Sequence, residues 1–179
     1  ATHLTGGTLQ TGIANALADS SALALSSGTT FDLNDFDQQV QNIGGSGDIT
    51  LGSATLTMQN TSDFGMNGVI SGTGGLVKEG TGTLTLAGVN TYSGGTVINA
   101  GRLSIFNEGA LGASSGGVTI NNNAAFDIGV PGEFDHNITL GTDGGTIIAT
   151  AGANLAGVID GTGHLTTQGI IDVTGENTY

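Results

Sequence analysis

The sequence contains no cysteine and few large side chains. Without cysteine the chain can form neither a disulfide nor a thiolate metal site. Aromatic residues make up 4% and charged residues 9% of its 179 residues, fewer than a compact globular core normally uses. No apolar run approaches the roughly 20 residues that a membrane-spanning helix needs. The core must therefore be built largely from Leu, Ile, Val and Thr, which stacked coils allow.

Basic side chains are almost absent as well. Lys78 and Arg102 are the only ones, against fifteen acids, so the formal net charge is −13. Because nucleic-acid binding depends on basic surfaces that release counterions, nucleic acid is excluded as a partner. An anionic membrane surface would repel the chain for the same reason. The sequence also opens without a basic-then-apolar stretch, so we expect no signal peptide within it.

Glycine, in contrast, is abundant. The 34 glycines and the single proline indicate many tight turns, without the period of collagen or the composition of a linker. They separate short strands in which apolar and polar residues alternate. The pattern recurs, because residues 157–165 repeat the frame of residues 68–76, and residues 175–179 repeat that of residues 88–92. Self-similar β segments between glycine turns predict a solenoid.

The spacing of apolar anchors predicts the size of one coil. One anchor follows each glycine-rich corner, and 162 residues separate the first from the last in seven steps of about 23. Strands of three to five residues joined by turns need roughly 20–25 residues for a three-sided coil. We therefore predict one all-β domain over residues 1–179, a right-handed parallel β-helix of about eight three-sided coils. The anchors are Leu9, Phe31, Leu56, Leu84, Leu103, Phe126, Ile148 and Ile171.

Departures from this spacing predict the irregular parts. The longest step, between the third and fourth anchors, predicts an outward loop near Asn60–Asn67. The region Ile128–Asn137, which holds the only proline, is the other predicted loop. In Gly12–Leu25 several alanines allow at most one helical turn before a strand that begins at Ala22. Both termini resemble the middle of a repeat rather than a cap, so we expect a piece of a longer solenoid.

A glycine-rich frame, GxGxLxKxGxGxLxLxGxNxYxGGTxIxxGxL, runs through residues 68–105. Its residues are Gly72, Gly74, Leu76, Lys78, Gly80, Gly82, Leu84, Leu86, Gly88, Asn90, Tyr92, Gly94, Gly95, Thr96, Ile98, Gly101 and Leu103. This frame resembles the passenger-associated transport repeat, also called the autotransporter-associated β-strand repeat, of Gram-negative type V secretion. Residues 157–179 resemble a partial, degenerate second copy with Thr167 in place of the lysine.

The resemblance implies a secreted passenger β-helix, carried to the cell surface by its own C-terminal β-barrel translocator, which is not in this chain. In the family the repeat is associated with efficient export and folding, and passengers variously serve as adhesins, self-associating proteins, toxins or proteases. We expect a non-enzymatic cell-surface segment that supports adhesion, self-association (aggregation or biofilm formation) and export. Its partner would be a like chain or a host-surface protein or glycan.

Two groups of carboxylates are the candidate binding residues. Asp32, Asp35 and Asp37 lie around one phenylalanine, and Glu133 and Asp135 flank another. Residues two apart on a strand share a face, so either group fits the paired acids of glycoside or pectate-type chemistry, or a calcium site. The alternative function is therefore a β-helical enzyme or module that cleaves or binds polysaccharide. We favour a solvated acidic face that keeps the solenoid soluble.

Three further patterns have structural interpretations. Gly112–Gly116 fits G-x-S-x-G, but no helix follows, as a nucleophile elbow requires. Gly44–Asp48 is similar to a calcium nonapeptide, but no run of nonapeptides follows. His3, His136 and His164 lack the spacing of metal ligands, and we expect them to be exposed. No metal and no cofactor is predicted.

Two pairs of residues recur one repeat apart. Asn99 and Asn121 each follow an isoleucine and predict an internal ladder of stacked amides. Tyr92 and Tyr179 occupy the same place in the two copies of the frame, which favours a packing role over ligand stacking.

Overall fold

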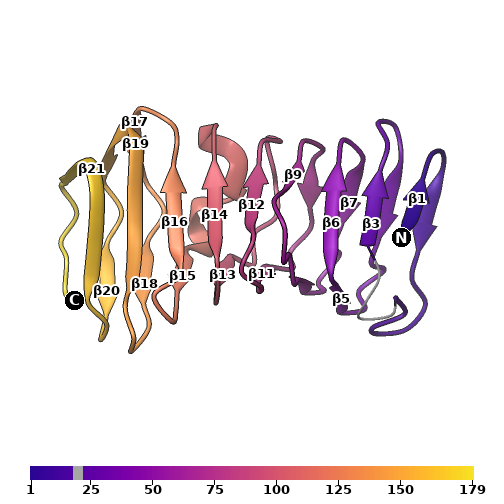
Figure 1. Ribbon diagram of the computed structural model, residues 1–179, viewed down its shortest axis with the longest axis horizontal. Coiled ribbons are helices and arrows are strands. Elements are labelled where there is room, and N and C mark those ends of the chain that lie inside the picture. The colour runs from indigo at the N-terminus through magenta and orange to yellow at the C-terminus, as the bar shows by residue number, and fades with distance from the viewer. Residues whose placement is uncertain (18–21) are drawn as a thin grey trace.

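The computed structural model describes residues 1–17 and 22–179 as one elongated stack of parallel strands (Figure 1). The two chain termini lie at opposite ends of the stack. Every strand pair in the three sheets is parallel, and each turn of the chain adds one strand to a sheet. The protein is therefore an all-β parallel solenoid of about eight coils, and the predicted fold class is confirmed.

Three sheets form the sides of the solenoid. Sheet A is the longest and consists of β1 (Thr2–Leu4), β3 (Ala22–Leu25), β6 (Asn42–Gly45), β9 (Phe64–Met66), β12 (Thr83–Leu86), β14 (Arg102–Ile105), β16 (Ala125–Ile128), β17 (Gly132–Phe134), β19 (Gly145–Leu155) and β21 (Leu165–Val173). Sheet B consists of β2 (Thr8–Gln10), β4 (Thr30–Asp32), β7 (Asp48–Thr50) and β10 (Ile70–Ser71). Sheet C consists of β5 (Gln38–Val40), β8 (Leu56–Met58), β11 (Leu76–Lys78), β13 (Thr96–Ile98), β15 (Val118–Ile120), β18 (Ile138–Leu140) and β20 (Ile159–Gly161).

The coils are shorter on average than predicted. Sheet A aligns Leu4, through its partners in five intervening strands, with Ile128, so 124 residues make six coils of about 21 residues each. The predicted 23 is wrong because the series of anchors moves from one sheet to another. Leu9 and Phe31 pair in sheet B, whereas Leu56 lies in sheet C and Leu84 in sheet A. An inward apolar residue marks a face of a strand but not a side of the coil.

The same error produced one of the two predicted loops. The long step from sheet C to sheet A suggested an outward loop at Asn60–Asn67, yet Asn60 is fully buried and β9 begins at Phe64. Only residues 59–63 turn between strands. The second predicted loop, Ile128–Asn137, contains the short strand β17, which pairs with β19. Phe134 in this strand is 4% exposed and pairs with Leu155, so the segment forms a side of the coil and not a free loop.

The helical turn allowed in Gly12–Leu25 falls partly on residues 18–21, which lie outside the described residues. Residues 12–17 form bends and turns, and the predicted strand at Ala22 is β3.

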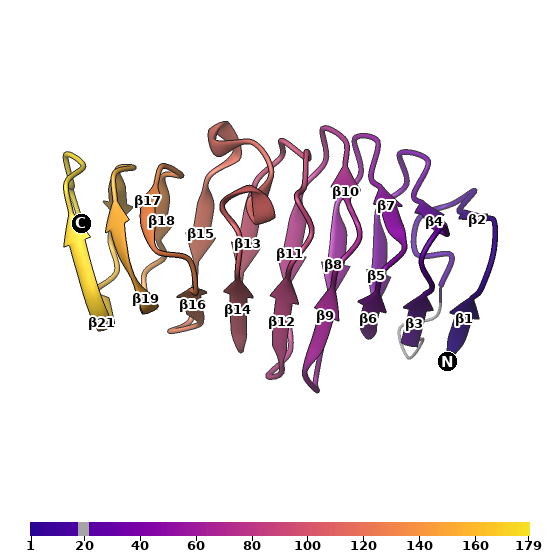
Figure 2. The same ribbon diagram turned by 90° about the horizontal axis from the view of Figure 1, so that it is seen from above.

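The side of the solenoid that sheet B forms changes in structure along the stack. After β10 the chain crosses this side without a strand in two coils, at residues 87–95 and 106–117. The second crossing contains two short 3₁₀ helices, η1 (Glu108–Leu111) and η2 (Ser114–Gly116), which project beside β13 and β15 (Figure 2). Strands resume with β17, which pairs with the half of β19 that follows a bulge at Ala149/Ala153.

The core is a set of columns that run along the solenoid axis. In sheet A, Leu25, Met66, Leu86, Ile105 and Ile128 occupy aligned inward positions and are all at most 2% exposed. A side chain of this size contributes about 1.5–3 kcal/mol when it is fully buried. Because each coil covers its inward residues only through its neighbours, stability is a sum over neighbouring coils.

Candidate functional site

The first group of candidate carboxylates lies at the corner between sheets B and C. The Ser53 backbone N–H donates to Asp35 Oδ1 (2.7 Å), and the Thr55 backbone N–H donates to Asp37 Oδ1 (2.7 Å). Asp32 Oδ2 accepts a hydrogen bond from Gln10 Nε2 (2.7 Å) in the preceding coil. Each acid therefore bonds a neighbouring coil, and the three do not converge on one place.

The second group lines a hollow. Glu133 and Asp135 are exposed and flank the buried Phe134, so they project to the same side, as alternation predicts. They border an open hollow of about 370 Å³ on the side where η1 and η2 replace the strand. We call this the acidic hollow; its lining is Glu108, Gly109, Gly112, Ser114, Val130, Glu133, Phe134, Asp135 and His136. Sequence reasoning missed Glu108, because only coil stacking brings η1 beside β17.

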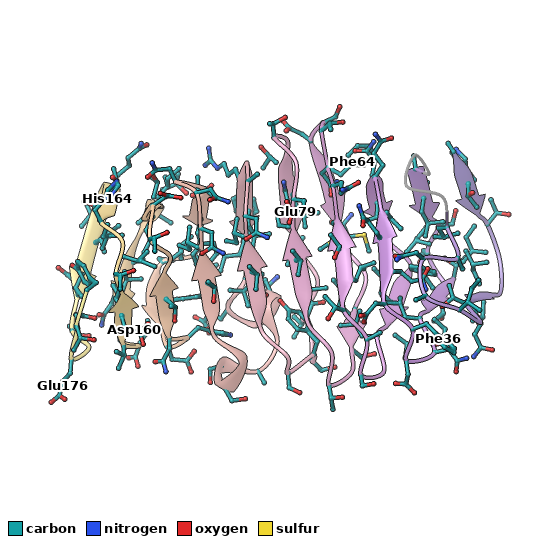
Figure 3. The ribbon with its side chains drawn as sticks, turned by 90° about the horizontal axis from the view of Figure 1, so that it is seen from below. Phe36, Phe64, Glu79, Asp160, His164 and Glu176 are labelled. Atoms are coloured by element: carbon teal, nitrogen blue, oxygen red, sulfur yellow. The ribbon has the colours of Figure 1, made fainter. Side chains whose placement is uncertain are left out.

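His136, at the edge of the acidic hollow, is buried rather than exposed. Only 4% of it is accessible, and its ring stacks on Phe134 with centroids 5.0 Å apart and planes 19° apart. Its Nδ1 lies 3.2 Å from Asp135 Oδ1, but neither ring nitrogen has a hydrogen bond of acceptable geometry. Burial lowers the pKa of the imidazole, and the Asp135 carboxylate opposes this shift. The expectation of exposure is wrong for His136, because its ring packs on Phe134, the last residue of β17. His3 and His164 are exposed, as predicted, and Figure 3 shows His164.

The repeat residues form a second set of polar contacts, and here they connect coils. Asn90 lies on the side without a strand and is 5% exposed. Its Oδ1 accepts from the Ile70 backbone N–H (2.8 Å) in the preceding coil, and its Nδ2 donates to the Ala110 carbonyl oxygen (2.5 Å) in the following coil. The side-chain amide thus supplies the donor and acceptor that a strand of sheet B would supply from its backbone.

Lys78 stands in an apolar column between Met58 and Ile98 and is fully buried. Its ammonium group donates to the carbonyl oxygens of Glu79 (2.6 Å), Gly80 (2.8 Å) and Ala100 (3.3 Å). Burial lowers the pKa of this lysine to about 8, although the carboxylates of Glu79 and Asp63 oppose the shift. The lysine of the frame therefore ties together the backbone at one corner of the coil.

Tyr92 is a packing residue, as predicted. It is fully buried, and its hydroxyl shares a 2.6 Å hydrogen bond with Thr96 Oγ1. Burial raises the pKa of the phenol, and the bond to Thr96 opposes that shift.

The glycines of the frame sit where neighbouring coils touch. A Cβ atom on Gly74 would overlap with the Ala54 backbone, and one on Gly88 would overlap with the Gly68 backbone. The other six behave in the same way against the coil before or after them; these are Gly72, Gly80, Gly82, Gly94, Gly95 and Gly101. Glycine at these corners lets the coils stack closely enough to form backbone hydrogen bonds.

The predicted amide ladder exists, but it is half-buried on the outer surface rather than internal. Asn121 Nδ2 donates to Asn99 Oδ1 (2.8 Å), and Asn99 Nδ2 donates to Glu79 Oε1 (2.7 Å). Glu79, which sequence reasoning did not include, ends the ladder near the middle of the stack (Figure 3). These residues line a polar groove of about 330 Å³ together with Asn122, Thr142 and Asp143.

The two motif-like segments are corners of coils. In Gly44–Asp48 the chain passes from β6 to β7, and Asp48 Oδ1 accepts from the Val69 backbone N–H (2.8 Å). In Gly112–Gly116, Ser114 begins η2 and does not follow a strand. Ser114 and His136 line the same hollow but form no hydrogen bond with each other.

Both cationic side chains of the protein are engaged within it. Lys78 is buried and donates hydrogen bonds to backbone carbonyl oxygens. Arg102 forms an ion pair with the buried Asp127, which also accepts a hydrogen bond from Ser104 Oγ (3.2 Å). Within residues 1–17 and 22–179, no three His, Asp or Glu side chains are placed to hold one metal ion. In the same residues, no helix is long and apolar enough to cross a membrane.

The structure is a parallel solenoid with glycine corners, in which side chains of the repeat bond neighbouring coils. The family model described as "Passenger-associated-transport-repeat" matches residues 76–105, within the frame predicted at 68–105. Residues 76–105 belong to this family of autotransporter repeats. Autotransporter passengers are exported to the surface of Gram-negative bacteria, and this is the location of the segment, as predicted.

Two curated relatives are also autotransporters. The chain is 33% identical over 168 residues to the adhesin BmaC autotransporter of Brucella suis biovar 1, which covers 84% of this chain and 5% of that protein. It is 37% identical over 78 residues to the autotransporter lipoprotein NalP of Neisseria meningitidis serogroup B, which covers 41% of this chain and 7% of that protein. The chain thus spans less than a tenth of the length of either relative. No solved structure matches it.

Proposed function

We propose that this segment is a non-enzymatic scaffold within a cell-surface adhesin passenger. The similarity to an autotransporter adhesin over 84% of the chain carries the proposal, because the matched length reaches across most of the solenoid rather than the repeat alone. The parent protein would include the translocator domain that delivers the passenger. The candidate carboxylates Asp32, Asp35 and Asp37 support a scaffold role, since each is engaged in contacts between coils.

Adhesion by such a surface would be multivalent. Each coil adds polar Thr, Asn and Asp side chains at about 4.8 Å spacing along a straight face. A single exposed hydrogen bond contributes only about 0.5–1.5 kcal/mol, so useful affinity requires many contacts in register. Because the net charge is −13 and both cations are engaged internally, two like chains repel each other at low salt. Contact between copies would therefore need salt or divalent cations.

The test uses fluorescent beads coated with residues 1–179, with beads that carry the urea-denatured chain as the matched control. The proposal expects native beads to bind host epithelial cells, or to aggregate with each other in physiological salt with calcium, at least about fivefold more than the control. Cell binding without aggregation would indicate a host partner, and aggregation alone would indicate self-association. If the native beads neither bind cells nor aggregate at any coating density, the adhesive role is contradicted and a spacer remains.

We also propose that the repeat supports folding during export. Lys78 and Asn90 of the frame bond neighbouring coils through Ala100, Ile70 and Ala110, and Tyr92 bonds Thr96 within its own coil. Such contacts favour a locally stable set of coils on which later coils can stack. Asn90→Ala should therefore lower the free energy of unfolding of the whole solenoid, which urea unfolding measures.

Residues 157–179 are proposed as the second copy of the frame. The Ile159 backbone N–H donates to Asn177 Oδ1 (2.8 Å), as Ile70 does to Asn90 in the first copy. The equivalent contact supports an equivalent register.

A further inference from the structure

The acidic hollow combines carboxylates from two separate coils. Glu108 comes from η1, and Glu133 and Asp135 come from β17 and the residue that follows it. All three side chains belong to exposed residues around one opening of about 370 Å³. Unlike Asp35 and Asp37, none of them accepts a hydrogen bond from the neighbouring coil among the described residues. The carboxylates of Glu108 and Glu133 are therefore available to another molecule, and Asp135 lies beside them with Oδ1 3.2 Å from His136 Nδ1.

A buried polar group at the same place provides an independent observation. His136 lines the hollow and is 96% buried, and neither ring nitrogen forms a hydrogen bond of acceptable geometry, although Nδ1 lies 3.2 Å from Asp135 Oδ1. A buried polar atom without a partner is costly, so such groups are uncommon in folded proteins. Burial lowers the pKa of this imidazole, so at neutral pH the uncharged ring carries one acceptor nitrogen beside the hollow.

The arrangement of acceptors limits the chemistry of the ligand. Among the described residues no three His, Asp or Glu side chains are placed to hold one metal ion, which favours an organic cation with several donors. A guanidinium group does this, because it carries five N–H donors in one plane. It also stacks on flat rings, and the stacked rings of Phe134 and His136 are part of the lining of the hollow. Val130 adds an apolar contact for an alkyl stem.

Neither basic side chain of this sequence is free to occupy the hollow. Its only arginine is paired with Asp127, and its only lysine is buried on backbone carbonyls. From these observations we propose that the acidic hollow binds the guanidinium group of an arginine side chain on a peptide or protein partner. The proposal goes beyond the adhesive scaffold and does not depend on it, because it concerns one pocket and not the multivalent face.

The test titrates the chain with three capped tripeptides, acetyl-Gly-Xaa-Gly-amide, in which Xaa is arginine, lysine or the uncharged analogue citrulline. The imidazole NMR signals report binding, since the protein has only three histidines and the His136→Gln spectrum assigns the signal of interest. The arginine peptide should shift the His136 signal saturably with a Kd of about 0.1–1 mM. The lysine peptide should bind at least about fivefold more weakly. Citrulline should produce no saturable shift.

Two double variants separate the pocket from the overall charge. Glu133→Gln with Asp135→Asn removes two charges from the hollow and should weaken binding of the arginine peptide at least about tenfold. Asp172→Asn with Glu176→Gln removes two charges from exposed positions in the last coil (Glu176 is labelled in Figure 3) and should change the Kd less than twofold. Equal weakening by both pairs, equal binding of citrulline or lysine, or no saturable shift of His136 would each overturn the proposal. The bead assay does not bear on these outcomes.

Discussion

Two adjoining regions of the solenoid cross the same side of the coil without a strand. They differ in whether their polar side chains form hydrogen bonds with neighbouring coils. In the repeat, Asn90 satisfies backbone groups of both neighbouring coils and is buried. In the coil after it, η1 and η2 leave His136 buried without a partner and the carboxylates of Glu108 and Glu133 facing an open hollow. The polar groups of the repeat are thus used in contacts between coils, whereas those of the following coil line an open hollow.

The two copies of the frame differ in a related way. Tyr92 is fully buried and bonded to Thr96, whereas Tyr179 is 53% exposed. Asn90 donates to the following coil, whereas Asn177 Nδ2 donates to the Gly175 carbonyl oxygen (2.7 Å) in its own corner. The two asparagines therefore share the contact to the preceding coil but differ in the group to which they donate.

The largest expected effect distinguishes these two copies. Asn90→Ala leaves the Ile70 N–H and the Ala110 carbonyl oxygen buried without partners, and should lower the free energy of unfolding by about 2–4 kcal/mol. Asn177→Ala, the matched control, should cost less than about 1 kcal/mol because it makes a single contact with a neighbouring coil. Urea unfolding measures both. Equal losses of stability would show that Asn90 contributes no more to the contacts between coils than Asn177 does.

An intermediate effect tests the buried lysine of the repeat. The folded pKa of Lys78, about 8, lies below the ordinary value of 10.5, so the unfolded chain holds more protons between these values. Stability contributed by this group therefore rises as pH increases through that window, by about 1 kcal/mol per pH unit. Urea midpoints at pH 8.0 and 9.5 should show the rise in the wild type, and Lys78→Met should remove it. Parallel pH profiles for the two proteins would contradict the buried-ammonium description.

The smallest effect belongs to the coil that contains the acidic hollow. Burial lowers the pKa of His136 below 6.5, so the unfolded chain takes up a proton first as the pH falls. Stability is then lost below about pH 6.5, by about 1 kcal/mol at pH 5.5 relative to His136→Phe, which keeps an aromatic ring beside Phe134 without the titrating group. The measurement is the difference between the two unfolding free energies at pH 7.5 and pH 5.5. A constant difference would mean that the imidazole is solvated.

The sequence by itself determined the class of fold and the identity of the repeat. Alternation within strands and glycine at the corners are local properties, so they predict a parallel solenoid without any knowledge of contacts. The frame at residues 68–105 carries enough matching positions to indicate its family, and the family model at residues 76–105 agrees. The pairing of Asn99 with Asn121 was also predictable, because their spacing equals one coil.

Only the tertiary structure decided which side of the coil each residue occupies. A period of two residues separates inside from outside but does not distinguish sheet A from sheet C, and for this reason the predicted coil of 23 residues exceeded the observed 21. Glu108 and Glu133 are 25 residues apart and meet at one hollow because coils stack. The burial of His136 and Lys78 has the same origin, since a side chain in a solenoid is covered by neighbours about 20 residues away in the sequence.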